Sequence, residues 1–230
     1  MFFNPAYPTY QAFVALGIAA IVTALLMPLW IKLLKIEGIG QQVRADGPKR
    51  HLVKQGTPTM GGVVILLGIV VSCLLLAQPV PSIMLAAGAA LATGALGLLD
   101  DVTSVAQGRS LGLTPRAKMV GLTLIVVAFF LAAVNLCGVE PVIRFPGGFA
   151  IDLGVLTTTF SVAGTTISVP WLYLVFVFLL LAGMSNAVNL TDGLDGLAGG
   201  TVMIAMLVMA AICFLRGDAN LAIFCAACAG

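Results

Sequence analysis

The sequence predicts an all-α, polytopic membrane protein, and three observations support this fold class. Of its 230 residues, 60% are apolar and 9% are charged, whereas a soluble domain has about 25% charged residues. The mean hydropathy is +1.13. The apolar residues also gather into runs close to the ~20 residues that a helix needs to cross a bilayer. Because so few charges cannot cover a water-facing surface, we expect lipid to surround most of the chain.

Six apolar runs have about the length of a membrane span. They lie near residues 10–34, 60–76, 82–99, 117–136, 169–184 and 201–215. A seventh begins near Ala219 and stops at the end of the sequence. A half-span exposed to lipid would leave its last carbonyl groups unpaired. We therefore expect residues 1–230 to form one integral membrane transferase domain, C-terminally incomplete, with about six full spans and a truncated seventh.

The segment 137–168 has a different pattern, typical of β-strands. Thr157, Thr159 and Ser161 recur at every second position, a second β-branched run covers residues 165–169, and Gly164 lies between the two. Alternation around a glycine predicts a hairpin. We expect this small hairpin to lie outside the hydrocarbon layer.

The positions of lysine and arginine predict the orientation of the spans. Nine of the eleven lie in or beside the segments 35–59 and 100–116, and the other two are Arg144 and Arg216. Cytoplasmic loops carry the excess of positive charge, so we expect these two segments and 185–200 to face the cytoplasm. The hairpin would face the periplasm in a Gram-negative cell. A net charge of +2 gives no general attraction for nucleic acid.

Asp100 and Asp101 close the third apolar run at its cytoplasmic end. Carboxylates at a membrane edge are costly, and they are therefore functional candidates. Adjacent carboxylates repel each other, and a divalent cation relieves that repulsion. Mg²⁺ usually takes one or two carboxylates together with substrate phosphates. The alternative is that two solvated acids simply open a polar loop over 100–116.

Asn186, Asn189, Asp192 and Asp195 recur at every third position after the fifth run. On a helix this spacing places them along one face. A neighbouring stripe of glycines would allow close approach by a substrate or another helix; it consists of Gly193, Gly196, Gly199 and Gly200. Such a ladder can hydrogen-bond a sugar or base, or hold a metal. The alternative is a polar clamp between helices.

The loop 35–59 is basic and contains a tight turn. Its positive side chains suit phosphate groups, and Gly56-Thr57-Pro58-Thr59 leads into the second span as a turn. No P-loop is present, so Lys, Arg and a metal would bind phosphates in place of a glycine cradle. Positive-inside anchoring explains Lys32 and Lys35, but not the group formed by His51, Lys54 and 56–59.

Three segments together resemble the phospho-N-acetylmuramoyl-pentapeptide transferases of the polyprenyl-phosphate sugar-1-phosphate transferase superfamily. The first segment runs from Arg44 to Gly62 and includes His51, Lys54 and Gly56-Thr-Pro-Thr-Met-Gly-Gly62. The second is Leu99-Asp100-Asp101 with Gly112-Leu113 and Lys118. The third runs from Asn186 to Ala198. The resemblance covers essentially the whole chain, and the third segment is the most specific.

The resemblance implies transfer of phospho-MurNAc-pentapeptide from UDP-MurNAc-pentapeptide to undecaprenyl phosphate, with Mg²⁺ and release of UMP. This reaction gives the first lipid intermediate of peptidoglycan synthesis, on which cell shape and division depend. Asp100 and Asp101 match the family's catalytic and metal-binding acids. The residues that match the substrate site are Lys54, Thr57, Lys118, Asn186, Asn189, Asp192 and Asp195.

The resemblance also implies ten spans, a homodimer and a site on the cytoplasmic face of the bacterial inner membrane. The family's third acid and its histidine-rich loop are absent from this sequence, which has one histidine. We therefore expect residues 1–230 alone not to turn over.

Two other readings remain open at this point. A sister enzyme that transfers N-acetylglucosamine-1-phosphate to the same lipid would share the mechanism and differ in the sugar. A transporter with intramembrane acids is a different class, but its acids would line a path at mid-membrane, whereas the inner-side acids here gather at span ends. A membrane scaffold would not need the Asn/Asp ladder.

Overall fold

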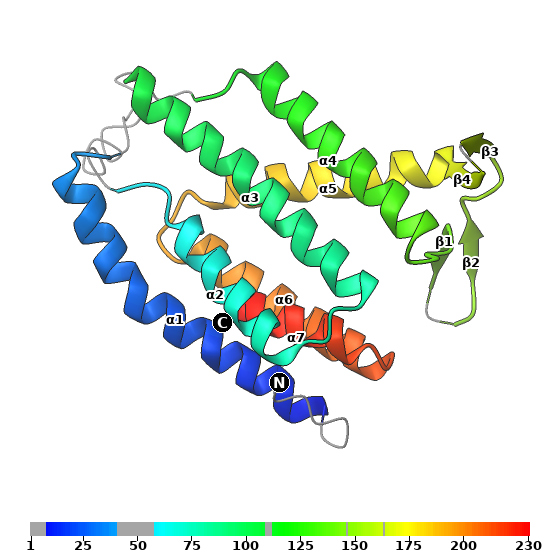
Figure 1. Cartoon of the computed structure of the whole chain (residues 1–230), viewed down its shortest axis with the longest axis horizontal. Helices are drawn as coiled ribbons and strands as arrows, with labels where there is room; N and C mark the ends of the chain where they lie inside the picture. Colours follow the sequence, from blue (N-terminus) through cyan, green and yellow to red (C-terminus); the bar gives the residue numbers. More distant parts are fainter. Residues whose placement is uncertain (1–7, 41–57, 109–111, 146, 163) are drawn as a thin grey trace. The chain divides into compact units, whose positions relative to one another are not determined.

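The computed structural model describes residues 8–40, 58–108, 112–145, 147–162 and 164–230. It is mostly helical, with a few short strands (Figure 1). The chain divides into two compact units. Unit 1 comprises Met1–Gly121 and Val202–Gly230, and unit 2 comprises Leu122–Thr201. Each unit is described by itself below.

Each predicted apolar run forms a helix. The helices are α1 (Pro8–Ile36), α2 (Gly62–Leu76), α3 (Pro81–Gln107), α4 (Pro115–Asn135), α5 (Trp171–Thr191), α6 (Leu197–Leu215) and α7 (Ala219–Ala229). Within the described ranges, all but α2 and α7 are long and apolar enough to span a membrane. The prediction of a multi-pass helical membrane protein is confirmed.

Helices α2 and α7 are shorter than a full span. They have 15 and 11 residues, or about 22 and 17 Å at 1.5 Å per residue, against a hydrocarbon layer of about 30 Å. Five helices therefore meet the length of a span, where the sequence predicted about six. The end of α2 has a local cause, because Pro79 and Pro81 follow it closely and proline cannot continue a helix.

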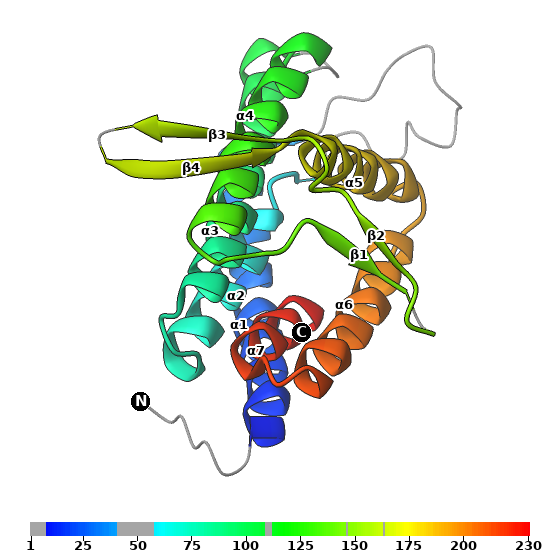
Figure 2. The ribbon, with the colours of Figure 1, turned by 90° about the vertical axis from the view of Figure 1, so that its right-hand side faces the viewer.

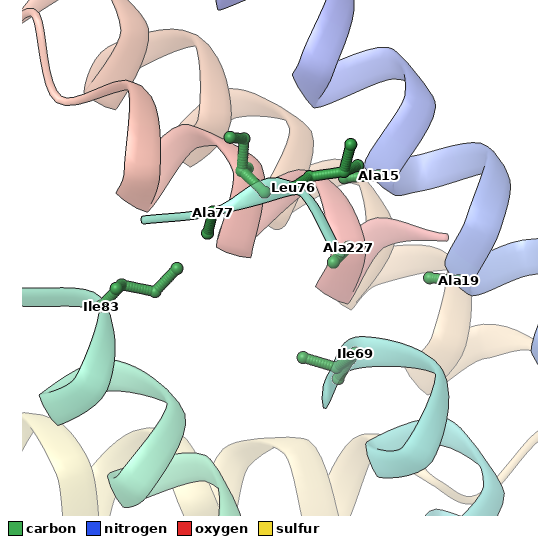
Figure 3. Close-up of a cluster of buried hydrophobic side chains, with 8 residues drawn as sticks. Ala15, Ala19, Ile69, Leu76, Ala77, Ile83 and Ala227 are labelled. Atoms are coloured by element: carbon green, nitrogen blue, oxygen red, sulfur yellow. The ribbon is translucent and has the colours of Figure 1, made fainter. Parts of the chain in front are cut away.

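The core of unit 1 forms around α7. This helix packs against α1, α2 and α3, and most of its residues are buried, with Ile223 fully covered and Ala227 1% exposed. Figure 3 shows alanines of α1 and α7 beside the larger Ile69 and Leu76 of α2. Alanine, glycine and cysteine are small, so the helix backbones can approach closely, as is usual where helices pack within a membrane.

Helices α1 and α2 pack closely in this core. Ala15 and Ala19 of α1 are buried, and so are Gly68 and Ser72 of α2. A side chain added at Gly68 would begin 3.1 Å from the carbonyl oxygen of Ala19 and 2.9 Å from Thr23 Oγ1. Each pair of small residues is four positions apart, which is the small-xxx-small spacing of tight helix pairs in membranes.

Helix α3 continues past its apolar run, which corrects the predicted loop over 100–116. It ends at Gln107 and is capped by Gly108 in the left-handed conformation, with φ +59°. Asp100 and Asp101 therefore lie on the last turns of a helix and do not open a loop. The Thr103 hydroxyl donates to the carbonyl oxygen of Leu99 at 2.6 Å, so this polar side chain is satisfied without leaving the helix.

Unit 2 contains two antiparallel hairpins between α4 and α5, where the sequence predicted one. The first pairs β1 (Val142–Arg144) with β2 (Ala150–Asp152), and the second pairs β3 (Thr157–Val162) with β4 (Thr165–Pro170). Figure 2 shows them as separate two-stranded ribbons. The predicted alternation over 157–169 is confirmed as the second hairpin, with Gly164 at φ +82° in its turn.

Asn135 at the end of α4 ties the second hairpin to the helix. Its amide donates to the carbonyl oxygen of Ser168 at 3.1 Å, and its Oδ1 accepts from the N–H of Ser168 at 2.7 Å. The Trp171 indole N–H donates to Thr158 Oγ1 at 2.9 Å. These bonds attach the hairpin to the end of one helix and the beginning of the next.

The close contact at Gly68 generates a stability prediction. Gly68→Val should destabilise unit 1 by about 1–3 kcal/mol, because the added methyl groups overfill the α1–α2 contact. Gly88→Val in α3 is the matched control, since nothing lies within 4 Å of a Cβ at that position. Thermal unfolding of the purified protein in detergent measures both variants. Equal unfolding temperatures for the two would contradict the packing argument.

Candidate functional site

Asp101 joins the end of α3 to the segment that begins α2. Its Oδ2 accepts a hydrogen bond from Thr59 Oγ1 at 2.9 Å and another from the backbone N–H of Met60 at 3.1 Å. Hydrogen bonds to a charged acceptor are about twice as strong as neutral ones. The last residue of the predicted Gly56–Thr59 turn and the residue after it therefore bind one of the two predicted catalytic acids.

Asp100 joins the same end of α3 to the beginning of α4. Its Oδ2 lies 2.7 Å from Lys118 Nζ, and its Oδ1 accepts from the backbone N–H of Leu113 at 2.7 Å. A Cβ on Gly112 would overlap both the backbone carbonyl and the carboxylate of Asp100. Only glycine therefore fits at position 112 while this segment remains in place.

The two carboxylates turn to different partners because they are consecutive on a helix, where neighbouring side chains point about 100° apart. Each is balanced by its own donors, from 59–60 for Asp101 and from 113–118 for Asp100. The sequence showed the pair but could not show this division of partners.

The ion pair between Lys118 and Asp100 is only partly shielded from solvent. The side chains are 46% and 25% exposed, respectively, and pairs of this kind contribute about 0–1 kcal/mol. The sequence predicted that Lys118 lies near a diphosphate. In this structure its ammonium group forms an ion pair with the Asp100 carboxylate. A weak, half-exposed pair can exchange one anionic partner for another at small cost.

The chemistry of the site suits Mg²⁺ in part. Asp100 and Asp101 offer hard oxygen ligands of the type that Mg²⁺ prefers. Over the ranges that the structure describes, no group of three or more His, Cys, Asp or Glu side chains could hold a metal. The donors present therefore fit an ion that completes its coordination with water and substrate phosphates, rather than a closed protein cage.

The Asn/Asp ladder is divided between a helix and a turn. Asn186 and Asn189 lie on α5, but α5 ends at Thr191, with Asp192 as its C-cap and Asp195 in the following turn. The expectation that all four share one helical face is therefore wrong for the two acids. The reason is local: Gly193 and Gly196 favour a turn, and Gly196 takes φ +80°.

The side chains of the ladder are on the surface of unit 2. Asn186, Asn189, Asp192 and Asp195 are all exposed. The Asn186 amide donates to the carbonyl oxygen of Ala182 at 2.8 Å, one turn earlier in the same helix. Asp100 and Asp101 belong to unit 1, so the two groups of candidate residues are positioned by different parts of the fold.

Lys54 and Thr57, with the rest of the basic loop up to residue 57, lie outside the described residues. Their assignment to the substrate site stays a prediction. Conversely, Met60 and Thr59 contact Asp101 and were not assigned to the site from sequence. Their place in the motif ending at Gly62 was the available signal, but nothing in the motif indicated which carboxylate they would bind.

Comparison with known proteins identifies relatives across the whole chain. The phospho-N-acetylmuramoyl-pentapeptide-transferase of Geobacillus kaustophilus is 37% identical over 97% of this chain and 65% of its own length. The protein of the same name from Bacillus subtilis is 38% identical over 91% of this chain and 61% of its own length. That from Corynebacterium jeikeium is 38% identical, over 85% and 56%. The chain thus spans a little under two thirds of the length of these curated relatives.

Two family descriptions match the residues discussed above. The first signature of the phospho-N-acetylmuramoyl-pentapeptide-transferases matches residues 54–66, which include the Thr59–Met60 donors of Asp101. The model of glycosyl transferase family 4 matches residues 83–230, which include both carboxylates, Lys118 and the Asn/Asp segment. Because this match covers more than half of the sequence, the chain belongs to glycosyl transferase family 4.

Proposed function

We propose that this chain is part of an enzyme that transfers phospho-MurNAc-pentapeptide from UDP-MurNAc-pentapeptide to undecaprenyl phosphate. The observation that carries the proposal is the similarity, over 97% of the chain, to a relative with the corresponding transferase name. No comparable observation favours the N-acetylglucosamine-1-phosphate transferase or the transporter. The product would be the first lipid intermediate of peptidoglycan synthesis.

The proposed reaction exchanges one phosphoanhydride for another. An oxygen of the lipid phosphate forms a bond to the sugar-linked phosphorus, and the bond from that phosphorus to the bridging oxygen of UDP breaks. The bridging oxygen leaves with UMP. Three negatively charged phosphates must therefore approach one another, so the site has to neutralise charge and hold the reacting groups in line.

The residues of unit 1 suit the phosphate end of this reaction. Lys118 neutralises Asp100 in the structure, and because the pair is weak, Lys118 can move to an incoming phosphate. That exchange would free the Asp100 carboxylate to act beside the lipid phosphate. Asp101 stays oriented by Thr59 and Met60. Lys54 and Thr57 would add contacts to the diphosphate.

Asp100 and Asp101 are also the residues that would hold Mg²⁺. When bound, Mg²⁺ would stabilise the negative charge of the diphosphate as a Lewis acid. Asn186, Asn189, Asp192 and Asp195 would bind the nucleotide and sugar, because amides and carboxylates can hydrogen-bond both. Their exposure on unit 2 leaves them accessible to a soluble substrate.

The proposed cellular setting follows from charge. Nine of eleven Lys and Arg residues lie in or beside 35–59 and 100–116, so these segments would face the cytoplasm of a bacterial inner membrane. Asp100 and Asp101 lie in the last turns of α3 and would face that same side, where UDP-linked substrates are available. A homodimer is part of the proposal by analogy with the family.

A transfer assay tests the proposed function. Because the chain spans 65% of the Geobacillus relative, we expect no lipid-linked product from residues 1–230 alone. A chimera that joins them to the part of this relative beyond the match should form product in nanodiscs with Mg²⁺ and undecaprenyl phosphate. It should use UDP-MurNAc-pentapeptide in preference to UDP-N-acetylglucosamine. Product from the second donor alone would identify the sister activity and contradict the proposal.

The carboxylates should matter for turnover more than for folding. In the active chimera, Asp100→Asn or Asp101→Asn should lower kcat by about 10²–10⁴-fold, as loss of a positioned acid does. The control is Glu140→Gln, which breaks the 2.6 Å exposed ion pair with Arg144 in unit 2. It should leave kcat and the unfolding temperature unchanged. Near-normal kcat in either aspartate variant would show that the carboxylates are not catalytic.

Cysteine labelling tests the proposed orientation. Ala106→Cys at the exposed end of α3 should resist a membrane-impermeant thiol reagent in intact cells. Thr166→Cys, exposed on β4, should react. Native cysteines are replaced by alanine or serine in both variants. Labelling of Ala106→Cys from outside would reverse the assignment of the two membrane faces.

A further inference from the structure

Met60 has a backbone conformation that needs external support. Its φ is +67°, and the other described residues with positive φ are all glycines. The left-handed region is unfavourable for a residue with a side chain, and such residues persist where the surrounding structure holds them. Met60 lies directly before α2 and donates its N–H to Asp101. The cause of its conformation therefore bears on the candidate site.

Hydrogen bonds hold Met60 from both sides. On one side its N–H donates to Asp101 Oδ2 at 3.1 Å, beside the bond from Thr59 Oγ1. On the other side its carbonyl oxygen accepts from the indole Nε1–H of Trp30 at 3.1 Å. Trp30 lies on α1 and Asp101 on α3, so a single residue connects these two helices at the beginning of α2.

Besides its hydrogen bond to Met60, Trp30 has a feature typical of a membrane anchor, and the two roles make different demands on the side chain. Tryptophan is common at the membrane interface, where its ring suits the headgroup layer. That role requires the ring and not a hydrogen bond to one particular carbonyl group. Trp171, the other tryptophan in the sequence, also donates one indole hydrogen bond, to Thr158 Oγ1 at 2.9 Å. It serves as an internal comparison.

We propose that Trp30 is a positioning residue that acts through Met60 on Asp101. By fixing the carbonyl side of Met60, Trp30 keeps this residue in its left-handed conformation. That conformation aims the Met60 N–H, and with it Thr59, at Asp101 Oδ2. The direction of the carboxylate is thus set, through Met60, by a residue on α1. The consequence for catalysis rests on the proposed function; the coupling between Trp30 and Asp101 does not.

Fluorescence of residues 1–230 tests the coupling without any activity. In a Trp171→Phe background, Trp30 is the sole tryptophan. Asp101→Ala should then shift the Trp30 emission maximum, because Met60 loses the acceptor that holds its N–H. Asp152→Ala, in the hairpin of unit 2, is the control and should leave the emission unchanged. An emission maximum that Asp101→Ala does not move would overturn the proposal.

Hydrogen exchange tests the coupling in the opposite direction. Trp30→Phe keeps an aromatic ring and removes the N–H donor, so the Met60 amide should exchange faster with solvent. Trp171→Phe removes the matched donor in unit 2 and should leave that amide unchanged. In a Met60→Gly background, Trp30→Phe should have a smaller effect on the amide of residue 60, because glycine takes positive φ readily. Equal effects in both backgrounds would overturn the proposal.

The transfer assay tests the consequence for catalysis. In the active chimera, Trp30→Phe should lower kcat about tenfold, the equivalent of one hydrogen bond, with KM for the UDP substrate unchanged. Trp171→Phe should retain activity. Equal losses in both variants would show general membrane anchoring in place of positioning. If the unsubstituted chimera forms no product, the proposed function fails, and the emission and exchange measurements still decide the coupling.

Discussion

The carboxylates of Asp100 and Asp101 bind the end of α3 to two other segments of unit 1. Asp101 accepts from Thr59 and Met60 before α2, and Asp100 binds Leu113 and Lys118 at the beginning of α4. Loops at a membrane face have few apolar contacts, so charge-assisted hydrogen bonds of this kind are well suited to position them. The positions of residues 59–60 and 113–118 at the end of α3 therefore depend on two adjacent side chains.

In the proposed reaction, the same bonds would make the site responsive to a charged ligand. Asp100 and Lys118 neutralise each other near the end of α3, and an unpaired charge beside a membrane span is costly. Their exposure keeps the pair weak, so a phosphate can compete for the lysine. Asp101 differs, because the backbone N–H of Met60 and the hydroxyl group of Thr59 donate to it. One acid is thus able to change partner, while the other is held in place.

Small residues allow the close helix packing that positions these hydrogen-bonding groups. Ala19 lies against Gly68 on α2, and Ala15 and alanines of α7 are buried in the core of unit 1. Lipid tails are as apolar as a leucine side chain, so the hydrophobic effect gives little driving force for helices to associate within a membrane. Close van der Waals packing therefore has to hold the helices together. This packing places the beginning of α2 near the ends of α1 and α3, where Trp30, Met60 and Asp101 form their chain of hydrogen bonds.

The sequence by itself determined the features that depend on local composition. Apolar runs predicted the helices, the alternation over 157–169 predicted a hairpin, and the doublet at 100–101 was identified as a candidate from its position after an apolar run. Other features also depend on local residues but were not predicted: helix α3 continues through the aspartates to Gln107, and Gly193 and Gly196 divide the Asn/Asp ladder between a helix and a turn. Tertiary structure decided the partners of the carboxylates. The pairing of Asp101 with Thr59 and Met60 spans about forty residues of sequence, and no local pattern specifies which distant donor a carboxylate will meet. Such contacts arise only when helix packing brings the segments together, because a hydrogen bond depends on distance and direction in space and not on separation along the chain.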